Sequence, residues 1–144
     1  MKKINNYING SLVSISKKEL PVDDPSTGEE IAKVVLSSNE DFEKTIESSK
    51  KSQIIWSNTT PLKRSRVLSN FKNLIEKNID ELASIISEEH GKTLADAKGS
   101  VTRGLEVVEF ACGIPHLLKG EFSQNVGTNI DSWSIRQPLG ICAG

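Results

Sequence analysis

The chain has 144 residues, of which 36% are hydrophobic and 26% are charged, and its formal net charge is −1 at pH 7. This size and composition fit one globular domain with a hydrophobic core. The balanced charge gives no support for nucleic acid or an acidic membrane surface as a partner. No segment is long and apolar enough to span a membrane, and no apolar stretch follows the N-terminal lysines. We therefore expect a cytoplasmic protein.

The first 36 residues have the pattern of a small antiparallel β unit. The pair Asn9-Gly10 lies between β-prone residues and predicts a hairpin over residues 7–13. Turn-forming residues at 24–29 precede the run Glu30–Leu36, which predicts another strand.

Helix-capping residues then mark the starts of two helices. Ser38 and Asp41 have the spacing of a capping box, and the first helix should end near residue 55 or 56. Thr60 followed by Pro61 predicts the start of the second, because proline is favoured in the first helical position.

Two more helices are predicted before residue 120. One should begin near Asn78 and end at Gly91, and the next is capped by Thr93 with Asp96 and should run to about Leu118. Apolar residues lie on both sides of this last helix, which predicts that it is buried. They are Leu94, Val101, Leu105, Val108 and Cys112 on one side and Val107, Phe110 and Ile114 on the other.

The last part of the chain predicts a connector and then a strand. Residues Gly120–Asp131 are rich in Gly, Ser and Asn, as connectors are, whereas Leu139–Ala143 is an apolar run typical of a strand buried on both faces in a parallel sheet. A hairpin, helices and such a strand form an incomplete α/β pattern. Ligands of these sheets bind beyond the carboxyl ends of the strands, so we expect the front of a larger enzyme.

Arg103 does not fit the helix on which it lies. It is one turn before Val107 on the helix predicted to be buried, and a guanidinium cannot lose its charge. It must reach water, pair with Asp96 or Glu106, or receive an anion such as a substrate carboxylate in two parallel hydrogen bonds. Spacing alone does not separate these alternatives.

The cysteines and histidines give no further candidate. Cys112 and Cys142 have apolar neighbours and are expected to be reduced, buried thiols, and neither has an activating base nearby in the sequence. His90 and His116 are far apart and lack the spacing of metal ligands, so no metal site is predicted.

Five segments together resemble the N-terminal part of NAD-dependent aldehyde dehydrogenases, in the family's order. They are Tyr7–Gly10, Asp24–Glu29, Trp56 with Pro61–Arg64, Glu89–Thr93 and Pro138–Gly144. Within that family the stretch Gly91–Gly113 and the ending Leu139–Gly144 are most similar to the CoA-acylating methylmalonate-semialdehyde branch.

The resemblance implies a reaction and a role for Arg103. The branch oxidises a malonate- or methylmalonate-type semialdehyde with NAD, loses CO2, and passes the acyl group to coenzyme A, giving acetyl-CoA or propionyl-CoA. The branch's arginine on this helix holds the substrate carboxylate, and it corresponds to Arg103.

The resemblance also implies what the chain lacks. Residues 1–144 would be the N-terminal part of a Rossmann-type NAD-binding domain that the chain leaves incomplete, with the catalytic domain absent. The family's catalytic cysteine, glutamate and asparagine, and its cofactor contacts, would lie beyond Gly144. The isolated chain is therefore expected to be inactive, marginally folded and unable to bind NAD tightly.

Residues 128–137 resemble the family's oligomerisation arm. Trp133 and Ile135, on one face of it, would then contact another subunit of a homo-oligomer, either a dimer or a tetramer. A solvent-exposed hairpin without a partner is the alternative for this segment.

Two other functions stay open. One is a non-acylating aldehyde or succinate-semialdehyde dehydrogenase, which would not need Arg103 for a malonate-type carboxylate. The other is a non-catalytic helical interaction module built from residues 38–119.

Overall fold

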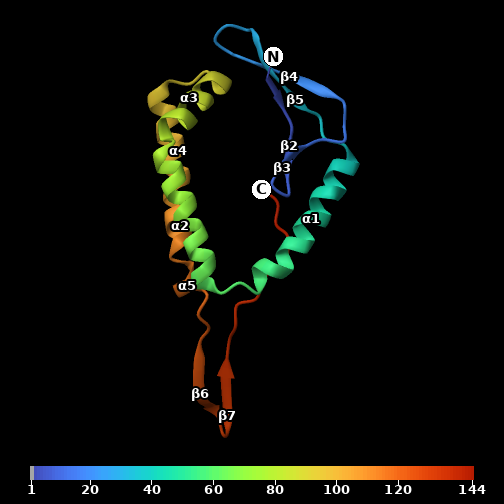
Figure 1. The fold of residues 1–144 in the computed structure, drawn as a ribbon. Coiled ribbons are helices and arrows are strands. Elements are labelled where there is room, and N and C mark those ends of the chain that lie inside the picture. The colour runs from blue at the N-terminus through green and yellow to red at the C-terminus, as the bar shows by residue number, and fades with distance from the viewer. Residues whose placement is uncertain (1) are drawn as a thin grey trace.

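The computed structural model describes residues 2–144, which form an α/β structure with two arms around an open centre (Figure 1). The elements in chain order are β1 (Lys2–Ile4), β2 (Asn6–Ile8), β3 (Ser11–Val13), β4 (Glu19–Asp23), β5 (Glu30–Val35), α1 (Asn39–Ser57), α2 (Pro61–Lys77), α3 (Ile79–His90), α4 (Leu94–Cys112), α5 (Ile114–Leu117), β6 (Phe122–Gly127) and β7 (Ile130–Trp133).

The N-terminal strands form a small sheet and a separate hairpin; the predicted antiparallel pairing is confirmed for the hairpin and for β4 with β5, but β1 pairs with β5 in parallel. The sheet has the order β1-β5-β4, with β5 parallel to β1 and antiparallel to β4. The hairpin pairs β2 with β3, and its turn residues Asn9 and Gly10 both have positive φ, at 52° and 77°. Two successive residues with positive φ match the twist of a tight hairpin, which explains the Asn-Gly pair.

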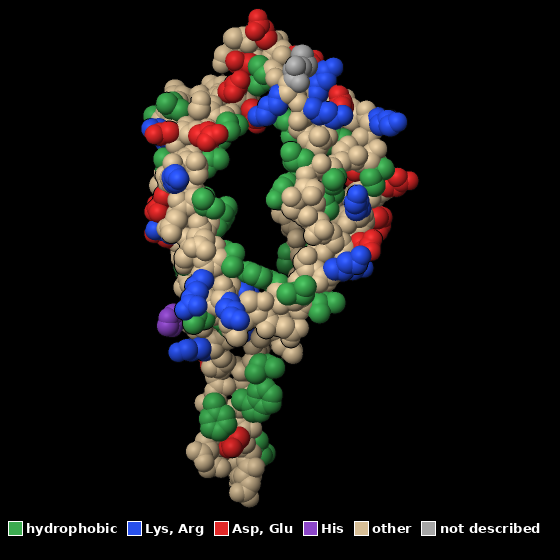
Figure 2. All heavy atoms as spheres, viewed as in Figure 1, with side chains coloured by type: hydrophobic (Ala, Val, Ile, Leu, Met, Phe, Trp, Pro, Cys, Tyr) green, Lys and Arg blue, Asp and Glu red, His purple; other side chains and the backbone are tan. Residues whose placement is uncertain are grey.

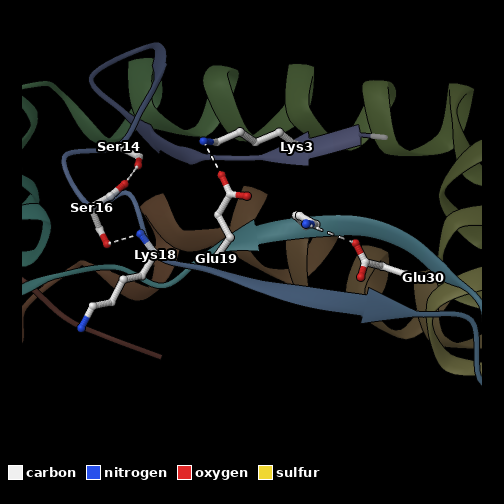
Figure 3. Close-up of polar contacts among 7 residues, drawn as sticks. Lys3, Ser14, Ser16, Lys18, Glu19 and Glu30 are labelled. Carbon is white, nitrogen blue, oxygen red and sulfur yellow. Dashed lines mark hydrogen bonds and ion pairs between the residues drawn. The ribbon is translucent and has the colours of Figure 1, made fainter.

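Ion pairs on the exposed side chains support the three-stranded sheet. Lys3 on β1 pairs with Glu19 on β4, reaching across the central strand, and Lys33 lies 3.8 Å from Glu30 (Figure 3). The hydrogen bond and charge of Lys3 lower the pKa of Glu19. Both pairs are partly exposed, so they contribute little to stability.

Asp41 joins the start of α1 to the loop after β3 and is the buried charged residue of this region, with 1% of its surface exposed. Its Oδ1 accepts a hydrogen bond from the backbone N–H of Ile15 at 2.7 Å, and Oδ2 accepts one from that of Ser16 at 3.1 Å. Oδ2 also accepts from the backbone N–H and the hydroxyl of Ser38, which completes the predicted capping box. We call this arrangement the Asp41 clamp.

The clamp keeps the carboxylate charged without a cation. The backbone hydrogen bonds from Ile15 and Ser38 hold the pKa of Asp41 well below its usual range, more than offsetting the opposite effect of burial.

Helices α2 to α5 form the second arm, in which α4 packs against α2, α3 and α5. The Ser65 hydroxyl on α2 donates to the Cys112 carbonyl at 2.6 Å. Lys72 on α2 pairs with Glu109 on α4 and with Glu76 on its own helix, each at 3.0 Å, and these bonds raise the pKa of Lys72.

The predicted helix ends are confirmed with one exception. Thr60 caps α2 with Pro61 in its first turn, Gly91 ends α3 in the left-handed conformation, and Thr93 caps α4. However, α4 ends at Cys112 rather than near Leu118. Residues Gly113 and Pro115 interrupt it, because proline removes a backbone donor, and the short α5 follows.

The prediction that α4 is buried on both sides is wrong for one side, since Val101, Leu105, Val108 and Cys112 are half-buried but the opposite side is not. Val107 and Phe110 are each 68% exposed, and the apolar residues buried in residues 2–144 are few: Ile8, Ala32, Val35, Ala83 and Ala97. Figure 2 shows that the centre of the ring is open and that hydrophobic side chains lie along its inner rim. No layer of the described residues covers that side of the helices.

The predicted strand Leu139–Ala143 is also wrong, since residues 134–144 contain no strand and Leu139 is 97% exposed. A strand needs a hydrogen-bonded neighbour, and none of the described strands pairs with this segment. Residues 140–143 instead border a groove along α1 with Phe42, Ile46 and Ile54. The connector predicted over residues 120–131 is mostly a hairpin of β6 and β7.

We expect Asp41→Asn to lower the thermal unfolding midpoint of the protein by several degrees, because the Asn amide would turn an NH2 group toward backbone donors. The contribution of Asp41 is present above the pKa of the unfolded chain and is lost as the pH falls below about 4. Thermal unfolding between pH 3 and pH 7 measures both effects. Asp24→Asn is the control, since Asp24 accepts one side-chain hydrogen bond in an exposed turn; an equal loss in both variants would contradict the clamp.

We also expect Gly91→Ala to destabilise the protein by roughly 1–2 kcal/mol, since Gly91 has φ +76°. An added Cβ would lie 2.8 Å from Cγ of Pro25, in the turn between β4 and β5 that meets the corner of α3 and α4. Gly104→Ala is the matched control, because nothing lies within 4 Å of its added Cβ and alanine favours the helix. Denaturant unfolding should separate the two variants, and equal stability would contradict the contact.

Candidate functional site

The best candidate site lies at the start and middle of α4, around Arg103. Arg103 follows Ser100 by three residues, so both lie on one side of the helix. Nη2 of Arg103 donates to Oγ of Ser100 at 3.1 Å. The burial expected for Arg103 is wrong, since its side chain is exposed in this chain.

Arg103 has no acidic partner among residues 2–144. Neither Asp96 nor Glu106, the two acids considered from the sequence, forms a salt bridge with it. Of the three alternatives for this guanidinium, internal pairing is therefore excluded within the described residues. Because Arg103 is exposed, its guanidinium reaches water in this chain, and its remaining donors can also bind an external anion.

A second cation reaches the same hydroxyl. Nζ of Lys92 donates to Oγ of Ser100 at 3.0 Å, and Lys92 is half-buried. The backbone of Lys92 is fixed from α3, because the Ser87 hydroxyl donates to its carbonyl at 2.7 Å. Gly91 and Thr93 on either side form the end of one helix and the cap of the next.

Sequence reasoning did not assign Lys92 or Ser100 to the site. The i, i+3 spacing of Ser100 and Arg103 could have indicated Ser100. Lys92 precedes the cap Thr93 and reaches Ser100, eight residues further along, beside the first turns of α4, which spacing along the sequence does not reveal.

The cysteines and histidines are not brought together. Cys112 is half-buried and Cys142 is exposed, so the expected burial of Cys142 is wrong. His90 ends α3 and His116 lies in α5. Within residues 2–144, no group of three or more His, Cys, Asp and Glu side chains could hold a metal ion, and no described helix is long and apolar enough to cross a membrane.

The hairpin of β6 and β7 extends away from both arms (Figure 1). Phe122 and Trp133 are directly opposite each other across its strands. Both are exposed, as are Val126, Ile130 and Ile135. Gly120 permits the close approach at its base, since an added Cβ would overlap the Ser134 carbonyl. The structure thus gives Trp133 and Ile135 an exposed position, and shows no partner for them among residues 2–144.

Comparison with known proteins identifies the architecture. The aldehyde dehydrogenase family matches residues 12–144. The malonate-semialdehyde dehydrogenase of Pseudomonas aeruginosa is 47% identical over 144 residues, covering 100% of this chain and 29% of that protein. The mitochondrial acylating methylmalonate-semialdehyde dehydrogenase of Arabidopsis thaliana is 46% identical over 143 residues, covering 99% of this chain and 24% of that protein.

A solved structure agrees with these sequence matches. It is a Sinorhizobium meliloti 1021 protein, assigned as a methylmalonate-semialdehyde dehydrogenase and complexed with NAD. The TM-score is 0.93 at 45% identity, over 97% of this chain and 29% of that one. The chain spans less than a third of the length of these relatives. Because the family match covers most of the chain and the fold agrees with it, the chain belongs to the aldehyde dehydrogenase family.

Proposed function

We propose that this chain is part of an NAD-dependent, CoA-acylating malonate- or methylmalonate-semialdehyde dehydrogenase, and that Arg103 binds the carboxylate of the substrate. The observation that carries the proposal is a guanidinium on α4 without an acidic partner among residues 2–144. Its planar fork can hold a carboxylate through two parallel hydrogen bonds. The names of the relatives in Pseudomonas and Arabidopsis support an anionic semialdehyde as the substrate.

The exposed apolar surfaces support a larger protein. Val107 and Phe110 on α4 and Leu139 near the end of the chain are large, apolar and exposed. Such surfaces are normally covered in a folded protein. We propose that the rest of the enzyme fills the open centre and covers them, and that Arg103 then lines the wall of a substrate tunnel.

The chemistry itself is assigned outside this chain. The sequence has no G-x-G-x-x-G turn that could hold the pyrophosphate of a dinucleotide. Cys112 and Cys142 have apolar neighbours and no activating base nearby in the sequence. The residues present therefore do not form an NAD site or a nucleophile, and the chain would contribute substrate recognition. NAD and coenzyme A remain proposals that rest on the Sinorhizobium complex and on the acylating relative.

We expect Arg103→Ala, placed in the full-length enzyme, to lower kcat/KM for malonate semialdehyde by roughly 2–4 kcal/mol, or about 30- to 1000-fold. Propanal, which has no carboxylate, should be affected far less. Steady-state NADH formation with both aldehydes measures this. An equal loss with both would reject the carboxylate role and favour a non-acylating or other aldehyde dehydrogenase.

NAD reduction by the purified 144-residue chain would contradict the assignment of chemistry to other parts of the enzyme.

We also propose that residues 128–137 form an oligomerisation arm. The double variant Trp133→Ser, Ile135→Ser should shift the full-length enzyme toward smaller assemblies, because it removes two exposed apolar side chains from the hairpin. Sedimentation velocity measures the distribution of masses. Leu62→Ser removes an exposed apolar side chain from α2 and is the control. An unchanged mass in the double variant would indicate a hairpin without a partner.

A further inference from the structure

The hydroxyl of Ser100 is shared by two cations. A serine hydroxyl has one hydrogen to donate and two lone pairs to accept with. The Ser100 hydrogen goes to the carbonyl of Asp96 at 3.1 Å, and the lone pairs accept from Nζ of Lys92 at 3.0 Å and Nη2 of Arg103 at 3.1 Å. The two charged nitrogens are therefore no more than about 6 Å apart.

This arrangement places two positive charges together without a negative one. Neither Lys92 nor Arg103 forms a salt bridge with any of residues 2–144, whereas Lys72 and Lys98 on the same arm each pair with an acid. Like charges at this separation repel each other. Lys92 is nevertheless held there by the Ser87 hydrogen bond to its backbone and by the helix ends around it.

We propose that Lys92 is a second substrate-contacting cation of the carboxylate site, and that Ser100 is a positioning residue that orients both cations. The guanidinium would take the two oxygens of the carboxylate in its plane, and the ammonium would bind a remaining lone pair as a point charge. This inference rests on the proposed function, because the anion is the carboxylate of the semialdehyde. A phosphate of coenzyme A is the other anion in this chemistry, and the experiment distinguishes it.

The test compares aldehydes in the full-length enzyme carrying Lys92→Gln. The ratio of kcat/KM for malonate semialdehyde to that for propanal should fall about tenfold, as expected for loss of one charge-assisted hydrogen bond. Lys92→Arg, which keeps the charge, should restore most of the ratio. Lys63→Gln is the control, since Lys63 is exposed on α2 and forms no salt bridge with the described residues. Ser100→Ala gives a second measurement if Lys92→Gln does not fold, with a several-fold fall expected.

The outcomes separate this inference from the proposed function. If Arg103→Ala lowers the ratio and neither Lys92→Gln nor Ser100→Ala does, the role of Lys92 is overturned and the proposed function stands. If none of the three variants changes the ratio, both fall. If Lys92→Gln instead raises KM for coenzyme A, the anion is a phosphate, and the assignment to the carboxylate is overturned.

Discussion

The structure depends on one buried carboxylate that is satisfied by backbone donors. The Asp41 clamp fixes the loop after β3 against the first turn of α1, so the N-terminal strands and the long helix have a defined relation. A buried charge without a cation is stable only if its lone pairs are filled, and here N–H groups from two segments fill them. The arm that carries α1 starts from this point. On the opposite side the turn that contains Pro25 touches Gly91, which closes the ring.

The ring is held at its ends and not by a central core. The buried apolar residues are small or lie in the N-terminal strands, while large ones on α4 and near the end of the chain, such as Leu139, are exposed. Burial of apolar surface is the main favourable contribution to folding. A chain that leaves this much of it exposed is expected to gain stability from whatever covers those faces. This agrees with the short span of the chain relative to its relatives.

Local chemistry made much of the fold predictable. The caps at Ser38, Thr60 and Thr93, the stop at Gly91 and the Asn9-Gly10 turn each depend on residues within a few positions, and the structure confirms them. The errors share a different cause. Apolar residues on α4 and in Leu139–Ala143 indicate surfaces that are suited to burial, but burial requires another layer, and residues 2–144 do not provide one. The apolar pattern indicates which side chains are suited to burial, but it does not indicate whether residues 2–144 contain the layer that would bury them.

In the candidate site, too, one residue could be predicted from its neighbours in the sequence and another could not. Arg103 was found because its charge contradicts its apolar neighbours, a comparison that the sequence allows. Lys92 could not be found in this way, because it precedes the helix and its side chain reaches Ser100 beside the first turns of α4. The two cations come from one short stretch, so their geometry is set by a single helix and its cap. A site of this kind can recognise an anion before other parts of an enzyme act on the aldehyde, because its geometry does not depend on them. Recognition of the carboxylate and chemistry at the carbonyl would then be carried by separate parts of the protein, which allows the charge preference to be changed without altering the reacting groups.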